Sequence, residues 1–291
     1  MTTLTRREAL VAAGMAGAGT LLGPATSPGE AAGPAVRNGR LRQSVSRWCY
    51  GKIPLPDFCR TVADMGLLGI DLLGEDDWPV LAEYGLVCTM GSGGGGSIAE
   101  GLNDPANHDG IVKGLTGMIP RAAKAGVPNV ITMVGNRKPG LDDAAAQANC
   151  VAALNRVKPV AEAEGVTVCV ELLNSKVDHA GYQGDHTAFV VDVLKAVDSP
   201  RIKALYDIYH MQIMEGDVIR TIRDNAPYIG HYHTGGVPGR HELDDTQELN
   251  YPAICRAIVE TGFTGYLAHE FVPTSDDPLA SLRDAVERCD V

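Results

Sequence analysis

The chain has 291 residues, of which 45% are hydrophobic and 21% are charged, so its composition is that of an ordinary globular protein. A chain of this length forms one large α/β domain or two small domains. Its formal net charge of −11 argues against general nucleic-acid binding, which needs a basic surface, and we expect no nucleic-acid partner. A small anionic substrate is still compatible with this charge, because a metal ion or a nearby arginine can reverse the sign inside a pocket.

Residues 1–32 have the pattern of an export signal rather than of a folded domain. Arg6 and Arg7 are followed by an apolar stretch from Leu10 to Leu22, and then by small residues, proline and glycine. The run TRREAL is similar to a twin-arginine signal, which sends folded proteins across the bacterial inner membrane. The alternative is an amphipathic start with two chance arginines on a cytoplasmic protein. The apolar stretch falls short of the roughly 20 strongly apolar residues of a membrane span. We therefore expect an exported, periplasmic protein with no stable span.

The chain contains seven cysteines, an odd number, and none of them are spaced as CxxC. This pattern fits neither a disulfide framework nor a zinc ribbon. Unpaired cysteines suit a protein that folds in the reducing cytoplasm, and a twin-arginine route would allow folding there before export.

Past residue 40, short apolar runs alternate with amphipathic stretches, which predicts alternating strands and helices. Strands are expected at 43–48, 69–73, 86–90, 130–134, 167–172, 202–207, 228–234 and 265–271. Helices are expected at 57–65, 109–125, 143–164, 187–197, 217–225, 251–260 and 278–286, with only a short helix in the second repeat. Eight strands followed by helices over about 250 residues predict a single (β/α)₈ TIM barrel of the α/β class, spanning 41–291. A doubly wound sheet would carry GxGxxG after its first strand, where this chain has RWCYGKIP.

The segment GSGGGGSIAEGLN, residues 91–103, follows the third predicted strand and is the one stretch of low complexity. It is not a phosphate-binding P-loop, because no Gly-Lys-Ser/Thr follows it. A barrel would place it on the catalytic face, and two interpretations remain open: a flexible surface loop or a mobile lid.

Four consecutive predicted strands end in chemically active side chains. Glu171 ends the fifth strand, Asp207 the sixth, His233 the seventh and Glu270 the eighth. In a barrel these strand ends meet at one rim. Each residue alone has an ordinary interpretation, such as a helix-capping Asp or a packed His, but clustered carboxylates repel one another unless a cation compensates them. Three carboxylates and one imidazole suit one divalent metal ion, with Mg²⁺ or Mn²⁺ favoured and Co²⁺ or Zn²⁺ as alternatives.

The motifs around these residues resemble the xylose-isomerase-like TIM-barrel superfamily over roughly 43–290. They are VELLNS (170–175), YDIYHMQIMEGD (206–217), IGHYHTGGVPGRHELDDTQELNY (229–251) and LAHEF (267–271). The VPGRHE block is most similar to hydroxypyruvate isomerase. The resemblance implies that Glu171, Asp207, His233 and Glu270 ligate one divalent ion, with the second histidine of HYH as the ligand. It also implies a small carbonyl or sugar substrate, and it leaves a homo-oligomer open.

The resemblance also suggests residues that contact the substrate. His210 matches a substrate-binding histidine, and Arg240 matches an arginine placed to meet a substrate carboxylate. Lys176 lies in the loop after the fifth strand, where it either reaches the substrate or is simply exposed, and His108 is expected to close over the site. Ketose 3-epimerases carry a second glutamate where this chain has Val177, which speaks against sugar epimerisation.

The reaction implied is a 1,2-carbonyl migration, as in the conversion of hydroxypyruvate to tartronate semialdehyde. Glu171 and Glu270 would flank the substrate as base and acid and move a proton between neighbouring carbons. An epimerase or dehydratase of the same superfamily and a non-catalytic exported sugar- or metal-binding barrel are the alternatives. A repair nuclease on this fold would need additional metal ligands and a basic surface. Trp48 and Tyr206 either line the pocket or pack in the core, and core packing is the expectation for both.

Overall fold

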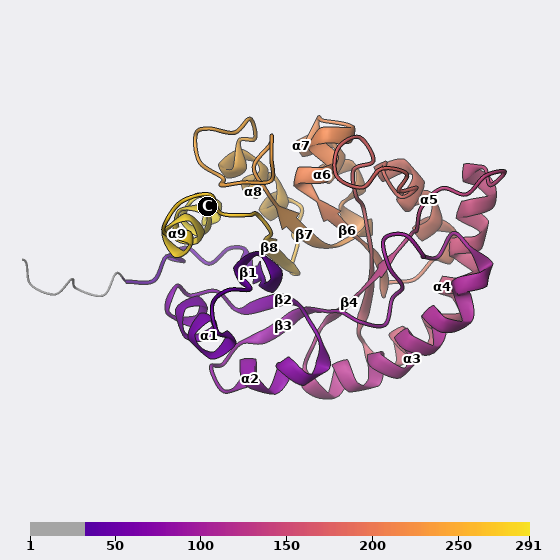
Figure 1. Ribbon diagram of the computed structural model, residues 1–291, viewed down its shortest axis with the longest axis horizontal. Helices are drawn as coiled ribbons and strands as arrows, with labels where there is room; N and C mark the ends of the chain where they lie inside the picture. The colour runs from indigo at the N-terminus through magenta and orange to yellow at the C-terminus, as the bar shows by residue number, and fades with distance from the viewer. Residues whose placement is uncertain (1–32) are drawn as a thin grey trace, which may run out of the picture. The chain divides into compact units, whose positions relative to one another are not determined.

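The computed structural model describes residues 33–291, and these form a closed barrel of eight parallel strands (Figure 1). The strands are β1 (Arg42–Ser46), β2 (Gly69–Leu73), β3 (Val87–Gly91), β4 (Asn129–Met133), β5 (Thr167–Glu171), β6 (Ile202–Asp207), β7 (Ile229–Thr234) and β8 (Tyr266–His269). Each strand pairs with the next along the chain, and β8 pairs with β1 to close the ring. The predicted TIM barrel is therefore confirmed. The predicted export signal at 1–32 lies outside the described residues.

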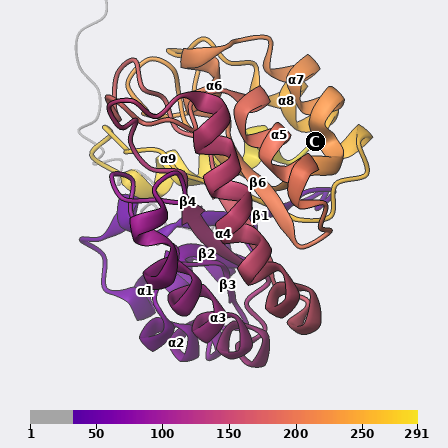
Figure 2. The same cartoon turned by 90° about the vertical axis from the view of Figure 1, so that its right-hand side faces the viewer.

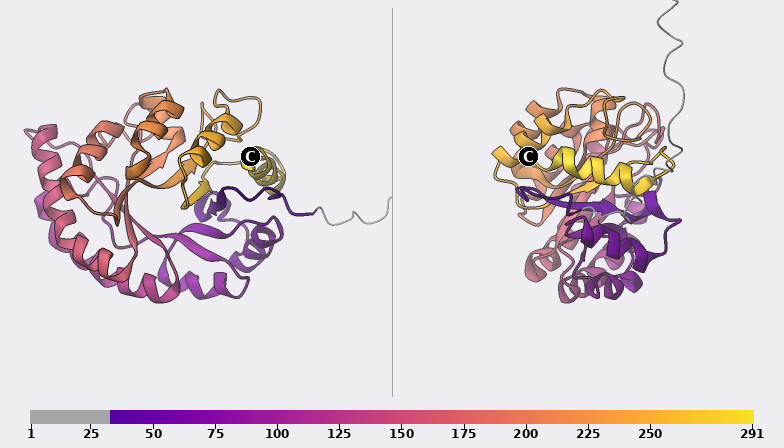
Figure 3. Two further views of the ribbon diagram at one scale, coloured as in Figure 1. Left: turned by 180° about the vertical axis from the view of Figure 1, so that it is seen from behind. Right: turned by 90° about the vertical axis from the view of Figure 1, so that its left-hand side faces the viewer.

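The helices form a layer around the outside of the strands, as Figures 2 and 3 show from three further sides. They are α1 (Leu55–Asp64), α2 (Trp78–Ala82), α3 (His108–Ala125), α4 (Asp143–Glu164), α5 (Thr187–Val197), α6 (Ile208–Met214), α7 (Val218–Asn225), α8 (Tyr251–Glu260) and α9 (Pro278–Cys289). Single turns of 3-10 helix lie at Arg47–Tyr50, Glu75–Asp77, Pro105–Asn107 and Ala226–Tyr228. The second repeat has only the short α2, as predicted. Within residues 33–291, every helix is too short or too polar to cross a membrane.

The strands read as apolar runs because helices cover one face and the barrel interior covers the other. In β5 all five residues, TVCVE, are buried, and so are four of the five residues of β2. Glycines end the helices α3 and α4: Gly126 and Gly165 have φ angles of 73° and 71°, in the left-handed region that glycine adopts without a steric penalty. A polar residue in such a strand therefore needs a specific partner, and the positions of the polar residues indicate which rim of the barrel carries the functional site.

The segment that precedes β1 and the segment that follows α9 are joined through one carboxylate. Asp290, just after α9, accepts hydrogen bonds from the backbone N–H groups of Arg37, Asn38 and Gly39 at 2.6, 2.7 and 2.8 Å. Three bonds to one charged acceptor are stronger than bonds between neutral groups. The contact fixes the segment before β1 against the last helix and so supports closure of the ring.

The glycine-rich segment 91–103 packs along the end of β4. Met133 N–H donates to the Gly95 carbonyl at 3.2 Å, and Leu102 N–H donates to the Met133 carbonyl at 3.0 Å. A Cβ atom on Gly95 would lie 2.0 Å from the Ile131 carbonyl oxygen, so glycine is required for this close approach. Regular pairing between β3 and β4 is limited to Gly91 and Val130, and the segment supplies backbone partners beyond it. Both interpretations of the segment, a flexible surface loop or a mobile lid, missed this packing.

Candidate metal centre

Four side chains meet at the C-terminal rim of the barrel, the end at which the strands terminate. Glu171 and Asp207 are the last residues of β5 and β6, His233 lies near the end of β7, and Glu270 follows β8. Each contributes one ligand atom, and these four atoms lie within 4.8 Å of one another in a buried position. The structure thus brings together all four residues that the sequence indicated as metal ligands.

The orientation of His233 fits metal binding. Its Nε2–H donates to the Asp71 carboxylate at 3.1 Å, so Nδ1 faces the carboxylates and offers its lone pair to a cation once its proton is displaced. Nδ1 lies 2.6 Å from Glu270 Oε2, 3.5 Å from Glu171 Oε1 and 3.9 Å from Asp207 Oδ2. It is buried and makes no aligned hydrogen bond to any of them. Three hard carboxylate oxygens and an available imidazole nitrogen are a suitable donor set for one divalent cation.

The charges of this cluster require compensation. Burial raises the pKa of Asp207 to about 7, and the neighbouring Glu270 adds to that rise while Arg240 opposes it. Burial alone would also raise the pKa of Glu270, but Arg240 and His233 hold it well below its ordinary value. Arg240 Nη2 lies 3.0 Å from Asp207 Oδ2 and 2.6 Å from Glu270 Oε2. Three buried carboxylates against one arginine and one histidine are the electrostatic setting in which a cation binds favourably.

Asp207 serves as a helix cap and as a member of the cluster at the same time. Its Oδ1 accepts a hydrogen bond from His210 N–H at 3.1 Å and caps α6, while Oδ2 faces His233 and Arg240. The cap starts a helix directly after β6, so His210 lies on α6. Asp217 stands at the cap position of the next helix, α7. It makes no cap bond, has a φ of 44°, and pairs instead with Arg220 at 2.9 Å.

Arg240 and Trp48 form a wall beside the cluster. Arg240 adopts a left-handed backbone conformation with φ 59°, and its guanidinium lies 5.4 Å from the Trp48 ring and 5.3 Å from the Tyr209 ring. The Trp48 indole N–H donates to Glu270 Oε1 at 2.5 Å, and 48% of this residue is exposed. Core packing, the expectation from sequence, is therefore wrong for Trp48. It is correct for the buried Tyr206.

Lys176 and His108 have partners that differ from those expected. The Lys176 ammonium donates to the Ile213 and Met214 carbonyls at 2.9 and 3.0 Å, where it satisfies the C-terminal end of α6. His108 is the first residue of α3, and its Nε2 is bonded to the Leu102 carbonyl at 2.9 Å. Both bonds go to backbone atoms, so substrate contact by either side chain stays a prediction.

Asp71 is a functional candidate that the sequence analysis missed. It is buried in β2, where it accepts hydrogen bonds from His231 Nε2–H at 2.6 Å, His233 Nε2–H at 3.1 Å and the Ser44 hydroxyl at 3.1 Å. Burial alone would raise its pKa, but the two histidines hold the pKa below its ordinary value. A carboxylate that fixes the tautomer of a ligating histidine strengthens metal binding. The available signal was the lone Asp inside the apolar strand GIDLL.

Replacing Asp71 with Asn is expected to weaken divalent-metal affinity by about 10- to 100-fold, because the amide no longer fixes the His233 tautomer. Calorimetric titration of the metal-free protein with Mn²⁺ measures this change. Asp76→Asn, at an exposed position in the loop after the same strand, is the matched control and should bind Mn²⁺ as wild type does. Unchanged affinity in Asp71→Asn would contradict the assigned role.

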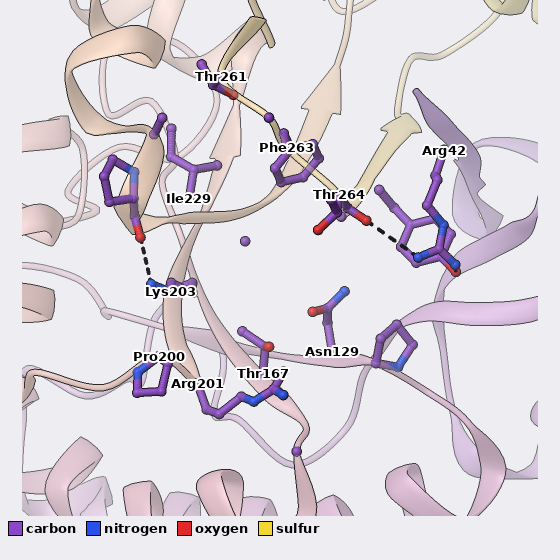
Figure 4. Close-up of a pocket in the computed structure, with 18 residues that line it drawn as sticks. Arg42, Asn129, Thr167, Pro200, Arg201, Lys203, Ile229, Thr261, Phe263 and Thr264 are labelled. Atoms are coloured by element: carbon purple, nitrogen blue, oxygen red, sulfur yellow. Dashed lines mark hydrogen bonds between the residues drawn. The ribbon is translucent and has the colours of Figure 1, made fainter. Parts of the chain in front are cut away.

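A pocket of about 430 Å³ lies at the end of the barrel opposite to the metal cluster (Figure 4). Residues at or near the starts of strands line it, among them Arg42, Asn129, Thr167 and Lys203. It contains none of the predicted site residues. Since catalytic groups of TIM barrels gather where strands end, the chemistry of this chain belongs to the other rim.

Comparisons with known proteins identify the family of this chain. Residues 79–290, well over half of the chain, match the xylose isomerase-like TIM barrel family. The chain is 33% identical over 197 residues to the 2-oxo-tetronate isomerase of Cupriavidus necator, covering 65% of this chain and 74% of that protein. It is 26% identical over 224 residues to the hydroxypyruvate isomerase of Escherichia coli, covering 72% and 85% of the two chains.

Among solved structures, AP endonuclease family 2 from Brucella melitensis has a TM-score of 0.72 to this chain at 22% identity, covering 83% of this chain and 97% of that one. At this identity the likeness concerns the fold alone. The resemblance read from the strand-end motifs is confirmed by the family match, and related proteins carry the names of isomerases. This protein belongs to the xylose isomerase-like TIM barrel family.

Proposed function

We propose that this protein is a divalent-metal-dependent isomerase of a small hydroxy-carbonyl compound, of the hydroxypyruvate isomerase type. The observation that carries the proposal is the buried cluster of Glu171, Asp207, His233 and Glu270 with Arg240 beside it. The names of its relatives, hydroxypyruvate isomerase and 2-oxo-tetronate isomerase, point to small hydroxylated oxo-acids as the substrate class.

Glu171, Asp207, His233 and Glu270 would hold the metal ion, with Mg²⁺ or Mn²⁺ favoured by the three hard carboxylates. When bound, the ion supplies Lewis-acid polarisation of the substrate carbonyl and hydroxyl oxygens. Asp207 is held in place for this role by the cap bond to α6, and His233 by its bond to Asp71.

In this reaction Glu171 and Glu270 transfer the proton. One carboxylate removes the proton from the carbon next to the carbonyl, and a proton then returns to the neighbouring carbon. Glu171 and Glu270 come from strands β5 and β8, which are not neighbours, so they can approach a substrate from different directions. Glu270 is oriented through both of its oxygens, by Trp48 N–H on Oε1 and by Arg240 on Oε2. This fixed orientation supports a defined proton path.

Arg240 is the proposed selector for a substrate carboxylate. Its guanidinium is held between Trp48 and Tyr209 at the mouth of the cluster. Its Nε and Nη2 already donate to Glu270 and Asp207, so Nη1 is the nitrogen left to donate a charge-assisted hydrogen bond to a substrate carboxylate. A neutral ketose offers no group for that pairing, so Arg240 favours oxo-acids over neutral sugars.

Arg240→Met is expected to lower kcat/KM for hydroxypyruvate relative to that for neutral dihydroxyacetone by about 10- to 100-fold, since charge-assisted hydrogen bonds are lost only by the acid. The ratio of the two values is the measurement, because general damage to the site affects both substrates. Arg220→Met, which removes an exposed arginine on α7, is the control and should leave the ratio unchanged. A wild-type ratio in Arg240→Met would exclude the selector role.

The function is tested by incubating purified protein with hydroxypyruvate, 2-oxo-tetronate and neutral ketoses, with Mn²⁺, with Mg²⁺ or with EDTA, and following the products by proton NMR. Metal-dependent formation of the carbonyl isomer is the expected result: an aldehyde from hydroxypyruvate or a ketose, and a 3-oxo acid from 2-oxo-tetronate. Exchange of substrate hydrogen in D₂O without migration of the carbonyl would favour the epimerase alternative. No turnover with any substrate would favour a non-catalytic binding barrel.

A further inference from the structure

His210 presents an unusual ring nitrogen to the site. Its side chain is fully buried, and within residues 33–291 its Nε2 has no hydrogen-bond partner. Nε2 lies 3.7 Å from Asp207 Oδ2, on the side of the metal cluster. A buried polar atom left without a partner costs free energy unless a ligand supplies one. A protonated Nε2 can donate a hydrogen bond to a substrate, and an unprotonated Nε2 can only accept one.

The orientation of the neighbouring Asn174 side chain follows from its own hydrogen bonds. Its Oδ1 accepts from the backbone N–H groups of Val177 at 3.0 Å and Asp178 at 2.9 Å. Its Nδ2 then donates to the Asp178 carboxylate at 2.6 Å and to His210 Nδ1 at 2.7 Å. The flipped amide would place oxygen against a carboxylate and nitrogen against two donors, so only one orientation satisfies all four contacts.

This orientation determines the tautomer of His210. Because Asn174 donates to Nδ1, Nδ1 must be an unprotonated acceptor, and in a neutral imidazole the proton is then on Nε2. His210 thus directs a single neutral N–H into the site.

We propose that Asn174 is a positioning residue that locks His210 as the neutral Nε2–H tautomer, which donates a hydrogen bond to the substrate oxygen that gains negative charge during proton removal. This inference rests on the proposed function. When a glutamate takes the carbon-bound proton, the C–H electron pair forms a C=C bond and the carbonyl electrons move onto oxygen. His210 stabilises that oxygen without transferring its own proton. When a proton returns to the former carbonyl carbon, the C=C pair forms the new C–H bond, the neighbouring hydroxyl oxygen becomes the carbonyl oxygen, and the hydroxyl proton moves to the oxygen that His210 holds.

A neutral donor suits this site better than an imidazolium. Nε2 lies 3.7 Å from Asp207 Oδ2, so an imidazolium there would pair with that carboxylate and be withdrawn from the substrate. The side chain of Asn174 is held by its bond to Asp178, and Asp178 is held in turn because it accepts a hydrogen bond from the Tyr209 hydroxyl at 2.8 Å. The hydrogen-bonded chain Tyr209, Asp178, Asn174, His210 therefore fixes one proton position.

The test exchanges the amide of Asn174 and the carboxylate of Asp178 through the double substitution Asn174→Asp and Asp178→Asn. The side-chain volumes and the bond between the two residues are retained, but a carboxylate now faces His210 Nδ1 and moves the proton to that nitrogen. Loss of one preorganised donor is expected to lower kcat by about 10²- to 10³-fold with a small change in KM. Asp178→Asn alone leaves Asn174 donating to His210 and should keep the wild-type tautomer.

The decisive readout is ¹⁵N NMR of histidine-labelled, Mg²⁺-loaded protein, with the His210 signals assigned by their loss in His210→Gln. Wild type should show a protonated Nε2 and an unprotonated Nδ1, and the double variant should show the reverse. Asn155→Asp, which introduces the same new carboxylate at an exposed position of α4, should leave the His210 signals and kcat unchanged.

A protonated Nδ1 in wild type would overturn the proposal even if the double variant does not fold. So would a reversed tautomer in the double variant with unchanged kcat. The NMR result does not depend on turnover, so absence of isomerase activity in wild type would reject the proposed function separately.

Discussion

Glu270→Gln is expected to lower kcat for isomerisation by at least about 10³-fold while the protein still folds, because one change removes both a metal ligand and a proton acceptor. Gln has nearly the same shape, and its carbonyl oxygen can still accept the Trp48 indole N–H that Glu270 Oε1 accepts. Arg240 keeps its second partner, Asp207. Steady-state kinetics with the metal-saturated protein, together with its circular dichroism spectrum, measure both expectations.

Glu260→Gln provides the matched control for Glu270→Gln. It removes a carboxylate that pairs with Arg223 on the outer helices, and it should leave kcat unchanged. Near-normal turnover in Glu270→Gln would remove Glu270 from the proposed proton path and from the set of required ligands.

Removal of the metal with EDTA is expected to abolish turnover and to lower the thermal midpoint by on the order of 10 °C. A ligand present at 1,000 times its Kd contributes about 4 kcal/mol to the stability of the native state, and about 1 kcal/mol shifts the midpoint of a chain of this size by roughly 2–4 °C. Readdition of Mn²⁺ or Mg²⁺ should restore both quantities. Full activity and an unchanged midpoint after chelation would contradict a catalytic metal.

The stabilisation by metal should also increase with pH. In the chelated protein the pKa of Asp207 is raised from 3.8 to about 7, mainly by burial, and the pKa of His233 is raised because Glu270 and Asp71 outweigh its burial. The native state then binds more protons than the unfolded state between about pH 4 and 7, so its stability falls as pH rises through that window. Glu270 has a lowered pKa, and its contribution is complete above its ordinary value of 4.5. Thermal midpoints measured with and without metal at pH 5 and pH 7 test this divergence.

The barrel could be predicted from the sequence because its signals are local. Strands covered on both faces read as apolar runs, and glycines such as Gly126 and Gly165 end helices through their own backbone conformation. The four cluster residues could be predicted for a related reason, since a charged residue at the end of an apolar strand is visible without knowing its neighbours. The parallel topology then places successive strand ends together.

What the sequence could not show depends on contacts across the barrel. Asp71 meets His231 and His233 although β2 and β7 are not neighbours, so no local pattern joins them. Trp48 is a large aromatic residue of the kind that usually packs in a core. Only the pairing of β1 with β8, which closes the ring, brings it to Glu270. Asp217 resembled a helix cap, but its backbone is left-handed and its side chain turns to Arg220.

The metal cluster draws all four of its members from the second half of the barrel, from β5 to β8. The first half contributes supports and walls instead: Asp71 from β2, Trp48 after β1, and the glycine-rich segment beside β4. The candidate ligands and the proposed selector Arg240 therefore come from one stretch of the chain, and the residues that orient them, Asp71 and Trp48, from another. An engineer who varies the loops after β1 to β4 should change how firmly the reacting groups are held before changing which reacting groups are present.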